Sequence, residues 1–386
     1  MILLKDILLE GEKRNILIDG NSFVDTSAPA SVPGAREIPC GGKAIVPAFY
    51  NTHTHAAMMP MRGGGDDLPL DRWLQDYIWP YEAGMTSEDI RKGDVLALQE
   101  MKSSGTVFFN DMYFDIEETI SEVCKAGTRA CIGITIMENH SKVELDGKLD
   151  FLNHWQDPSG GRISIAIAPH AIYTVGTERL KMAAALARDN GLKIHIHLSE
   201  TLKEVEDCLK EHGMTPVNYL DSIGFLGPDV VAAHCVHVNE QEWDLLAERG
   251  VSVSHCPCSN MKLGSGRFPY ELAIKSGVRI TLGTDSASSN NNLDMREEMK
   301  FAALLAKVNG DPQLLPARQV LSWATENGAA AFGIKSGRIE AGYLADAVLL
   351  DLDNVRLQPA NDIISSWVYA ADSGCITDVM CDGKFV

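Results

Sequence analysis

Histidine and aspartate residues stand at the ends of apolar, strand-like runs through the middle of this sequence. Six of eight such runs end in His or Asp or are followed at once by one of them. The side chains concerned are His53, His55, His170, His195, His197, His234, His255 and Asp285. Because the carboxyl ends of parallel strands meet at one rim of a barrel, we expect these groups to converge there. Imidazole and carboxylate groups around one point can bind a divalent metal ion such as Zn²⁺.

Two His-x-His pairs have a spacing that suits a metal site. Side chains two residues apart on a strand point to the same face, so His53 and His55 can offer two imidazoles to one ion. A chance His-x-His in a loop is the alternative interpretation. His195 and His197 repeat the spacing, and we expect one of these two to be a ligand.

Two carboxylates complete a candidate hydrolytic site. Glu200 follows His197 by three residues, just past the strand, and Asp285 ends the last strand. A metal such as Zn²⁺ lowers the pKa of its bound water toward about 7, and a carboxylate beside it can then move protons. The alternatives are a first-turn helix acid for Glu200 and an N-cap or turn residue for Asp285.

A thiolate site at His255, Cys256 and Cys258 is an alternative metal site. Only Pro257 separates its two cysteines, which is closer than in the usual structural zinc knuckle. We therefore prefer the site built from imidazoles and carboxylates.

Alternating strand-like and helical segments predict the fold that positions these groups. Helical patterns at 87–105, 177–191 and 239–250 each end in glycine, a common helix stop. Eight buried strands with intervening helices predict an α/β fold, a (β/α)8 TIM barrel. A doubly wound open sheet is the alternative, but no strand is followed by G-x-G-x-x-G. The predicted strands are KAIVPAFYNTHTH, GTVFFNDM, RACIGITIM, RISIAIAPH, LKIHIHLSE, DVVAAHC, GVSVSHCP and GVRITLGTD.

Both ends of the chain read as short strands separated by turns. The first segments are rich in β-branched residues and glycine, and GRIEAGYLADAVLLDLD and CITDVMCDGKFV near the other end are similar. Because the termini of a domain often lie close together, we predict a small β-sandwich domain formed from residues 1–47 and 338–386. Residues 48–337 then form the barrel domain.

Composition excludes several classes of protein. The 386 residues carry a net charge of −19, and no cluster of Lys and Arg is present to bind nucleic acid or an anionic membrane. Lys5 and Asp6 interrupt the apolar N-terminal run, and no stretch of 18 apolar residues predicts a membrane span. Nine scattered cysteines indicate reduced thiols and a cytoplasmic protein.

Several motifs along the sequence resemble those of a known family. The motifs NTHTHAAMMPMRG, HIHLSET, AAHCVH, SHCPCSNMKLGSG and TLGTDSASSNNNLDM are similar to those of the amidohydrolase superfamily, and within it to the 5'-methylthioadenosine/S-adenosylhomocysteine deaminases. The resemblance covers nearly the whole chain, including GYLADAVLLD near the C-terminus. It implies a homo-oligomer and a mononuclear site for one divalent metal, with Zn²⁺ preferred, because no carboxylated lysine is visible on the fourth strand.

The resemblance also implies a role for each residue of the site. The implied metal ligands are His53, His55, His197 and Asp285, which leaves His195 as a neighbour rather than a ligand. Asp285 is implied to act also as a base, and His234 to orient the attacking hydroxide. Glu200 is implied to deliver a proton to ring N1 of the substrate.

Three further positions concern the substrate. Glu82 matches the residue that binds the ribose hydroxyls in the family, and His170 matches one that contacts the purine edge. The loop after the third strand, MENHSKVELDGKLDFLNHW, lacks the arginines that hold an amino-acid tail, and only Lys148 falls near one expected position. The guanidinium group of arginine is planar and binds a carboxylate through two N–H donors, whereas lysine offers a single compact charge. The missing arginines therefore argue against S-adenosylhomocysteine, whose amino-acid tail ends in a carboxylate.

The resulting hypothesis is a hydrolytic deaminase acting on the 6-amino group of a small-molecule nucleoside. The candidate substrates are 5'-methylthioadenosine, adenosine and 5'-deoxyadenosine. The alternatives are a deaminase of another aminated ring, such as guanine, cytosine or an s-triazine, and a metal-binding barrel without catalytic activity.

Overall fold

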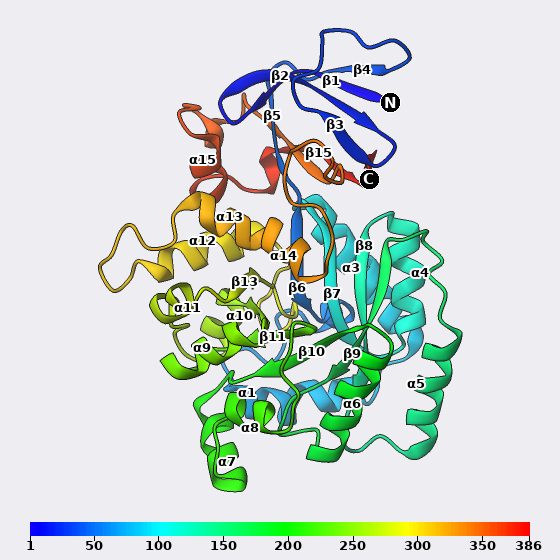
Figure 1. Cartoon of the computed structure of the whole chain (residues 1–386), viewed down its shortest axis with the longest axis vertical. Helices are drawn as coiled ribbons and strands as arrows, with labels where there is room; N and C mark the ends of the chain where they lie inside the picture. Colours follow the sequence, from blue (N-terminus) through cyan, green and yellow to red (C-terminus); the bar gives the residue numbers. More distant parts are fainter.

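Eight parallel strands form a barrel in the computed structural model, which describes residues 1–386 (Figure 1). Each strand pairs with the next along the chain. The barrel closes where the Asp285 amide donates to the His53 carbonyl over 2.9 Å. The strands are β6 (Phe49–Thr54), β7 (Thr106–Tyr113), β8 (Arg129–Ile136), β9 (Ile163–Pro169), β10 (Lys193–Leu198), β11 (Val230–His234), β12 (Ser252–His255) and β13 (Arg279–Leu282). The predicted TIM barrel is confirmed.

Helices surround the barrel and bury the outer face of its strands, while the inward side chains of the strands fill the interior, so both faces are buried. This double burial explains why the strands are continuous apolar runs without alternation. The main core contains 74 buried residues from strands and helices. The helices are α3 (Ser87–Ser103), α4 (Ile116–Ala126), α5 (Lys142–His154), α6 (Thr177–Asp189), α7 (Leu202–His212), α8 (Pro216–Ser222), α9 (Glu240–Glu248), α10 (Pro257–Lys262), α11 (Tyr270–Ser276), α12 (Met295–Ala306), α13 (Ala317–Ala324) and α14 (Glu326–Ala331).

A chain of short helical turns follows β6 and contributes residues to the carboxyl end of the barrel. It consists of η1 (Ala56–Met61), α1 (Leu70–Trp73), η2 (Leu74–Ile78) and α2 (Trp79–Glu82). Six of its apolar side chains, among them Met58, Trp73 and Ile78, join Ile90 of α3, Tyr113 of β7 and Leu263 after α10 in a separate core of nine buried residues. This shared core holds the segment against the barrel.

The segment predicted as a single first strand is two strands with different partners, so that prediction was wrong in this detail. β5 (Lys43–Pro47) pairs antiparallel with β14 (Ala347–Asp351) in a terminal sheet, whereas β6 pairs parallel with β7 in the barrel. Ala48 separates them. Most residues of the run are buried, so hydrophobicity does not mark the break.

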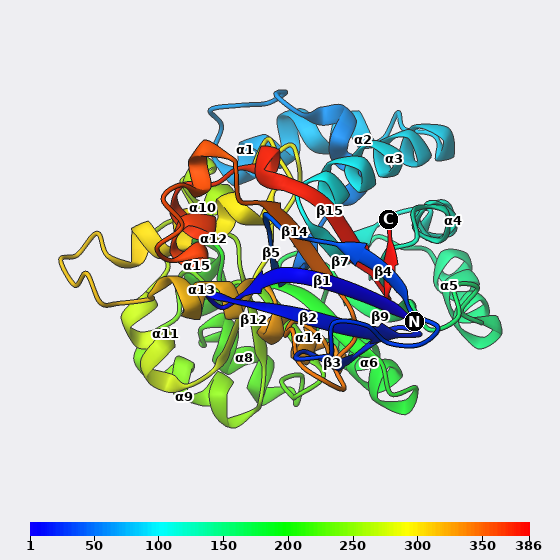
Figure 2. The ribbon, with the colours of Figure 1, turned by 90° about the horizontal axis from the view of Figure 1, so that it is seen from above.

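The two ends of the chain build one small β domain above the barrel (Figures 1 and 2). The remaining strands of its sheet are β1 (Ile2–Leu9), β2 (Glu12–Asp19), β3 (Ser22–Asp25), β4 (Arg36–Pro39), β15 (Ile376–Cys381) and β16 (Lys384–Phe385). On one side β1 pairs antiparallel with β2, with a register shift between Leu4 and Ile7. On the other side it pairs parallel with β4 along its first half and with β5 at Leu8. The sheet surrounds its own core of 12 buried residues.

Part of the C-terminal segment packs on the barrel and not in the small domain. α15 (Ile363–Tyr369) lies against α12 and α13, and its Trp367 is buried in the main core. The turns η3 (Val355–Leu357) and η4 (Ser373–Cys375) flank it. The domain boundaries at residues 47 and 338 and the homo-oligomer stay predictions. No helix is long and apolar enough to cross a membrane.

Candidate active site

Three imidazoles and one carboxylate meet at the carboxyl rim of the barrel. The Nε2 atoms of His53 and His55 lie 3.5 and 3.4 Å from Asp285 Oδ1. The Nε2 atom of His197 lies 3.3 Å from that of His55. Donor atoms about 2.1 Å from a tetrahedral centre lie about 3.4 Å from one another. These distances therefore match the edges of a coordination tetrahedron.

Hydrogen bonds on the far side of each ring turn its Nε2 toward the centre. His55 donates from Nδ1 to the Met112 carbonyl, and His197 donates from Nδ1 to the His170 carbonyl, each over 2.7 Å. The Nε2 atom of His53 is buried and has no hydrogen-bond partner. Metal-bound histidines characteristically engage their second nitrogen in this way. The donor set therefore fits one divalent metal ion.

The protonation states of these groups also suit a metal. Burial lowers the pKa of His53 to about 4, against the opposing effect of Asp285. Burial and the neighbouring His170 hold the pKa of His197 well below its usual range. Burial raises the pKa of Asp285, but the close approach of His53 and the charges of the other imidazoles outweigh burial and hold this pKa low. Neutral imidazoles and an ionised carboxylate are the forms that bind metal.

His195 lies behind His53 and not among the candidate metal donors, the position that the family resemblance implied for it. Its Nε2 is 2.8 Å from Nδ1 of His53, and both side chains are fully buried. Because Nε2 of His53 is directed at the centre, the ring proton of His53 lies on Nδ1. This N–H group donates a hydrogen bond to Nε2 of His195. The contact selects the His53 tautomer that can bind metal through Nε2.

Replacing His195 should weaken metal binding. We expect His195→Ala to reduce Zn²⁺ affinity by about 10- to 100-fold, the usual cost of losing a partner of a metal-bound histidine. Competition with a chromogenic chelator measures this change. His255→Ala is the matched control, since it also removes a buried strand-end imidazole but contacts no member of the metal site. Unchanged affinity in the His195 variant would contradict the assignment.

Glu200 and His234 face each other beside the donor set. Glu200 Oε2 lies 3.8 Å from Nε2 of His234, and Ser265 Oγ donates to Glu200 Oε1 over 3.1 Å. Burial raises the pKa of Glu200. Burial lowers the pKa of His234, but Glu200 and Asp285 outweigh it and raise this pKa. A carboxyl group with a raised pKa beside an imidazole is suited to proton transfer near neutral pH.

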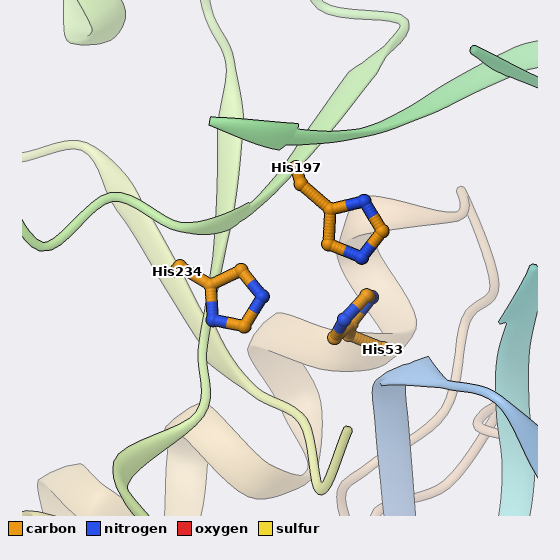
Figure 3. Close-up of side chains that lie close together, drawn as sticks. All are labelled: His53, His197 and His234. Atoms are coloured by element: carbon orange, nitrogen blue, oxygen red, sulfur yellow. The ribbon is translucent and has the colours of Figure 1, made fainter. Parts of the chain in front are cut away.

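His234 also belongs to a second group of possible ligands. His53, His197 and His234 have ring nitrogens within 4.8 Å of one another, and Figure 3 shows the three rings facing a common space. The Nδ1 atom of His234 is bound to Asn260 Oδ1 over 2.9 Å, and its Nε2 lies 3.8 Å from Glu200 Oε2. The contacts of 3.3 to 3.5 Å that link His53, His55, His197 and Asp285 match the edge of a coordination tetrahedron, so we infer that Asp285 is the fourth ligand and His234 a neighbour of the metal.

Several of these residues sit in strained backbone. Ser199, His234 and Asp285 have φ values of 49°, 72° and 61°, in the left-handed region that non-glycine residues rarely adopt. Each of these residues lies at or shortly after the end of a barrel strand, where the chain turns sharply. Such strain persists at functional sites where the surrounding structure enforces it.

Three residues that the structure brings to the site were not predicted from the sequence. Ser259 Oγ donates to Asp285 Oδ2 over 2.6 Å, while Asn260 and Ser265 contact His234 and Glu200 as described above. All three belong to α10 or the turn after it, within SHCPCSNMKLGSG. The sequence signal that could have indicated them is their position as polar residues soon after β12, whose carboxyl end lies at the rim of the barrel.

The sites around His255, Cys256 and Cys258 show no metal-ligand geometry. His255 lies 2.8 Å from the Tyr270 hydroxyl and stacks on Phe268 with ring centroids 4.1 Å apart. Both cysteines are buried free thiols. The imidazole and carboxylate site is therefore preferred on structural grounds too.

A pocket lined by 20 residues, 12 of them hydrophobic, opens onto the metal site. Glu82 and His170 line it, together with Glu200, His234 and the aromatic residues Trp73, Trp79 and Tyr173. No lysine or arginine is among its lining residues. A pocket with apolar walls and few polar groups is typical of small-molecule sites.

Lys148 is not brought into this pocket. It lines a neighbouring cavity together with Asp115 and Glu144, and only Tyr113 and Phe114 are shared between the two cavities. Burial lowers the pKa of Lys148, against the charges of Glu144 and Asp115. The structure therefore gives no contact through which Lys148 would reach a ligand at the metal site.

A closed eight-stranded barrel with this donor set at its carboxyl rim defines a class of protein, the metal-dependent barrel hydrolases. Residues 44–386 match the model of the Amidohydrolase family, and the chain belongs to this family.

Named relatives cover most of the chain. The 5'-deoxyadenosine deaminase of Methanothermobacter thermautotrophicus is 46% identical over 378 residues, which are 96% of this chain and 88% of the relative. The 5-methylthioadenosine/S-adenosylhomocysteine deaminase 1 of Archaeoglobus fulgidus is 44% identical over 395 residues, covering 100% and 93%. A crystal structure of an adenosine deaminase from Xanthomonas campestris with bound zinc superposes with a TM-score of 0.92 at 35% identity, covering 100% of this chain and 92% of that one.

Proposed function

We propose that this enzyme hydrolyses the 6-amino group of an adenosine-type nucleoside whose 5'-substituent is small and uncharged. The observation that carries the proposal is the composition of one pocket. The pocket is lined by three of the four candidate metal donors, His55, His197 and Asp285, and by two acids, the buried Glu200 and Glu82. The relatives described above are named for 5'-deoxyadenosine and for 5-methylthioadenosine, which belong to this class, and one of them is also named for S-adenosylhomocysteine, which does not.

The chemistry assigns each polar group a task. A divalent ion held by His53, His55, His197 and Asp285, for which we choose Zn²⁺, would lower the pKa of bound water toward about 7. The oxygen of water adds to C6 of the purine ring. Glu200 transfers the proton from that water to N1, and a second proton transfer to the amino group releases ammonia. His234 and Asp285 orient the attacking oxygen.

The apolar walls fit the base and the acid Glu82 fits the sugar. Trp73, Trp79 and Met58 line the pocket and offer flat or flexible apolar surfaces to a purine. Glu82 is partly buried, and burial raises its pKa. Two adjacent ribose hydroxyls would donate to its carboxylate oxygens. His170 lies near the ring of His197 and is assigned to the purine edge.

The charges around the pocket argue against an amino-acid tail on the substrate. A substrate carboxylate needs a cation, and none lines the pocket. Arg179 approaches from α6, but its guanidinium donates to the carbonyls of Met137 and His140 over 2.6 and 2.9 Å and approaches Glu138 within 3.4 Å. These contacts occupy the guanidinium N–H groups of Arg179 that would otherwise bind a substrate carboxylate. 5'-Methylthioadenosine, 5'-deoxyadenosine and adenosine are the preferred substrates.

Glu82→Gln should raise KM for nucleosides by about 10- to 100-fold while kcat changes little. The amide offers one acceptor oxygen in place of two and loses the charge, a cost of about 1.5–3 kcal/mol for a hydrogen bond to a charged group. Steady-state ammonia release on 5'-deoxyadenosine measures the change. An unaltered KM would contradict the assignment of Glu82 to the ribose hydroxyls.

A substrate panel tests the proposed function. Ammonia release is measured with adenosine, 5'-methylthioadenosine, 5'-deoxyadenosine, S-adenosylhomocysteine and guanine, with zinc analysis on the same sample. We expect turnover of the first three and little with the last two. Dominant turnover of S-adenosylhomocysteine would overturn the argument from the missing cations. Preferred turnover of guanine would overturn the assignment to nucleosides.

A further inference from the structure

The turn between β10 and α7 carries Glu200, and a second buried acid holds its backbone. Glu204 accepts hydrogen bonds from the backbone amides of Ser199 and Glu200, each over 2.8 Å, through its two different carboxylate oxygens. Glu204 is 5% exposed and does not line the pocket. It therefore contacts the proposed acid only through the main chain.

This arrangement departs from the usual start of a helix. Thr201 caps α7 and Glu204 is the third residue of the helix, a pattern in which the acid normally accepts from the amide of the capping residue. α3, α5 and α9 follow that rule, for example Glu242, which accepts from the amide of Asn239 over 2.9 Å. In α7, Glu204 instead accepts from the amides of Glu200 and Ser199, which lie one and two residues before the capping residue Thr201.

The two amides belong to the strained part of the turn. Ser199 has a φ of 49°, which costs a non-glycine residue about 1–3 kcal/mol and persists only when neighbours enforce it. Its carbonyl accepts from the His237 amide over 2.9 Å, so its main chain is held from both sides. The left-handed turn directs the Glu200 side chain to Ser265 and His234.

We infer that Glu204 is a positioning residue, which fixes the strained Ser199–Glu200 turn so that the Glu200 carboxylate faces the substrate. The catalytic consequence rests on the proposed function, because it assumes that Glu200 transfers protons. A displacement of about 1 Å in a reacting group can reduce turnover by about 100-fold. The structural consequence, protection of two backbone amides, is independent of any activity.

The first experiment measures kinetics and zinc content of Glu204→Gln. In glutamine, an NH2 group replaces one of the two carboxylate oxygens and faces a backbone N–H group. Two donors cannot form a hydrogen bond, so the turn loses one of its two contacts and its fixed geometry. We expect kcat to fall by about 10- to 100-fold, with KM and zinc content unchanged. Glu242→Gln is the matched control, a buried acid at the same helix position that makes no contact with Glu200. Unchanged kcat, or a rise in KM alone, would overturn the inference.

A double-mutant cycle separates this role from a general structural one. If Glu204 acts through Glu200, its replacement should have little further effect on the residual activity of a Glu200→Gln enzyme. An equal loss of activity in both backgrounds would overturn the inference. Should Glu204→Gln fail to fold, Glu204→Asp keeps the charge at the helix start, but its side chain is one methylene shorter and should give the same kinetic result.

Hydrogen exchange followed by mass spectrometry provides the readout without activity. The peptide containing Ser199 and Glu200 should exchange faster in the Glu204 variant and at the wild-type rate in the Glu242 variant. Unchanged protection in the Glu204 variant would overturn the inference. A wild-type protein that releases no ammonia from any compound of the panel would contradict the proposed function alone, because the exchange result would still stand.

Discussion

Glu200→Gln should retain the metal and lose nearly all turnover. Glutamine has almost the same shape and can still accept from Ser265, but it cannot carry a proton to ring N1. General acid and base groups contribute about 10²- to 10⁴-fold to a rate, and we expect kcat to fall by about 10³-fold. Ammonia release and zinc analysis on the same preparation measure both properties.

The control for this prediction is Glu206→Gln on the same helix. Glu206 is exposed, so its replacement removes an equal charge without touching the site. Its kcat should equal that of the wild-type enzyme. A Glu200 variant that keeps both its zinc and its turnover would show that another group moves the proton.

Removal of the metal should abolish activity and lower the stability of the protein. Treatment with a strong chelator should reduce turnover by more than about 10⁴-fold, because water away from zinc has a pKa higher by about 8 to 9 units. Zinc at about 1,000 times its dissociation constant adds about 4 kcal/mol to the free energy of unfolding. Ammonia release and thermal unfolding, with and without added zinc, measure the two effects.

His197→Ala tests the same metal dependence by removing a candidate ligand instead of the metal. It removes one donor from the tetrahedral set, so zinc content and kcat should fall together and excess zinc should restore little activity. The Glu206 variant again serves as the control. Full activity of the chelated enzyme would contradict a metal-dependent reaction.

The barrel and the rim on which its histidine and aspartate residues converge were predictable because both follow from local periodicity. Continuous apolar runs separated by helical patterns indicate parallel strands, and the carboxyl ends of such strands share one rim. His53 and His55, two residues apart, therefore had to face the same side. The resemblance to a family then distinguished His197 from His195, which spacing alone left open.

The supporting contacts around the donors were not predictable from the sequence. His195 behind His53, Asn260 behind His234 and Ser259 behind Asp285 lie 142, 26 and 26 residues from their partners. No sequence pattern specifies which polar side chain fills the space behind a ligand. The position of Lys148 in a neighbouring cavity was equally hidden, because it depends on how α5 packs.

Sequence by itself therefore determined the class of fold, the rim on which the chemistry lies and the types of donor, since strand period and barrel topology leave little choice in these. Tertiary structure alone decided the separate pairing partners of β5 and β6, the direction in which each imidazole points and the hydrogen bonds that Glu204 makes beyond the helix cap. These features depend on contacts between segments far apart in the chain or on strained backbone, and neither is encoded in local periodicity.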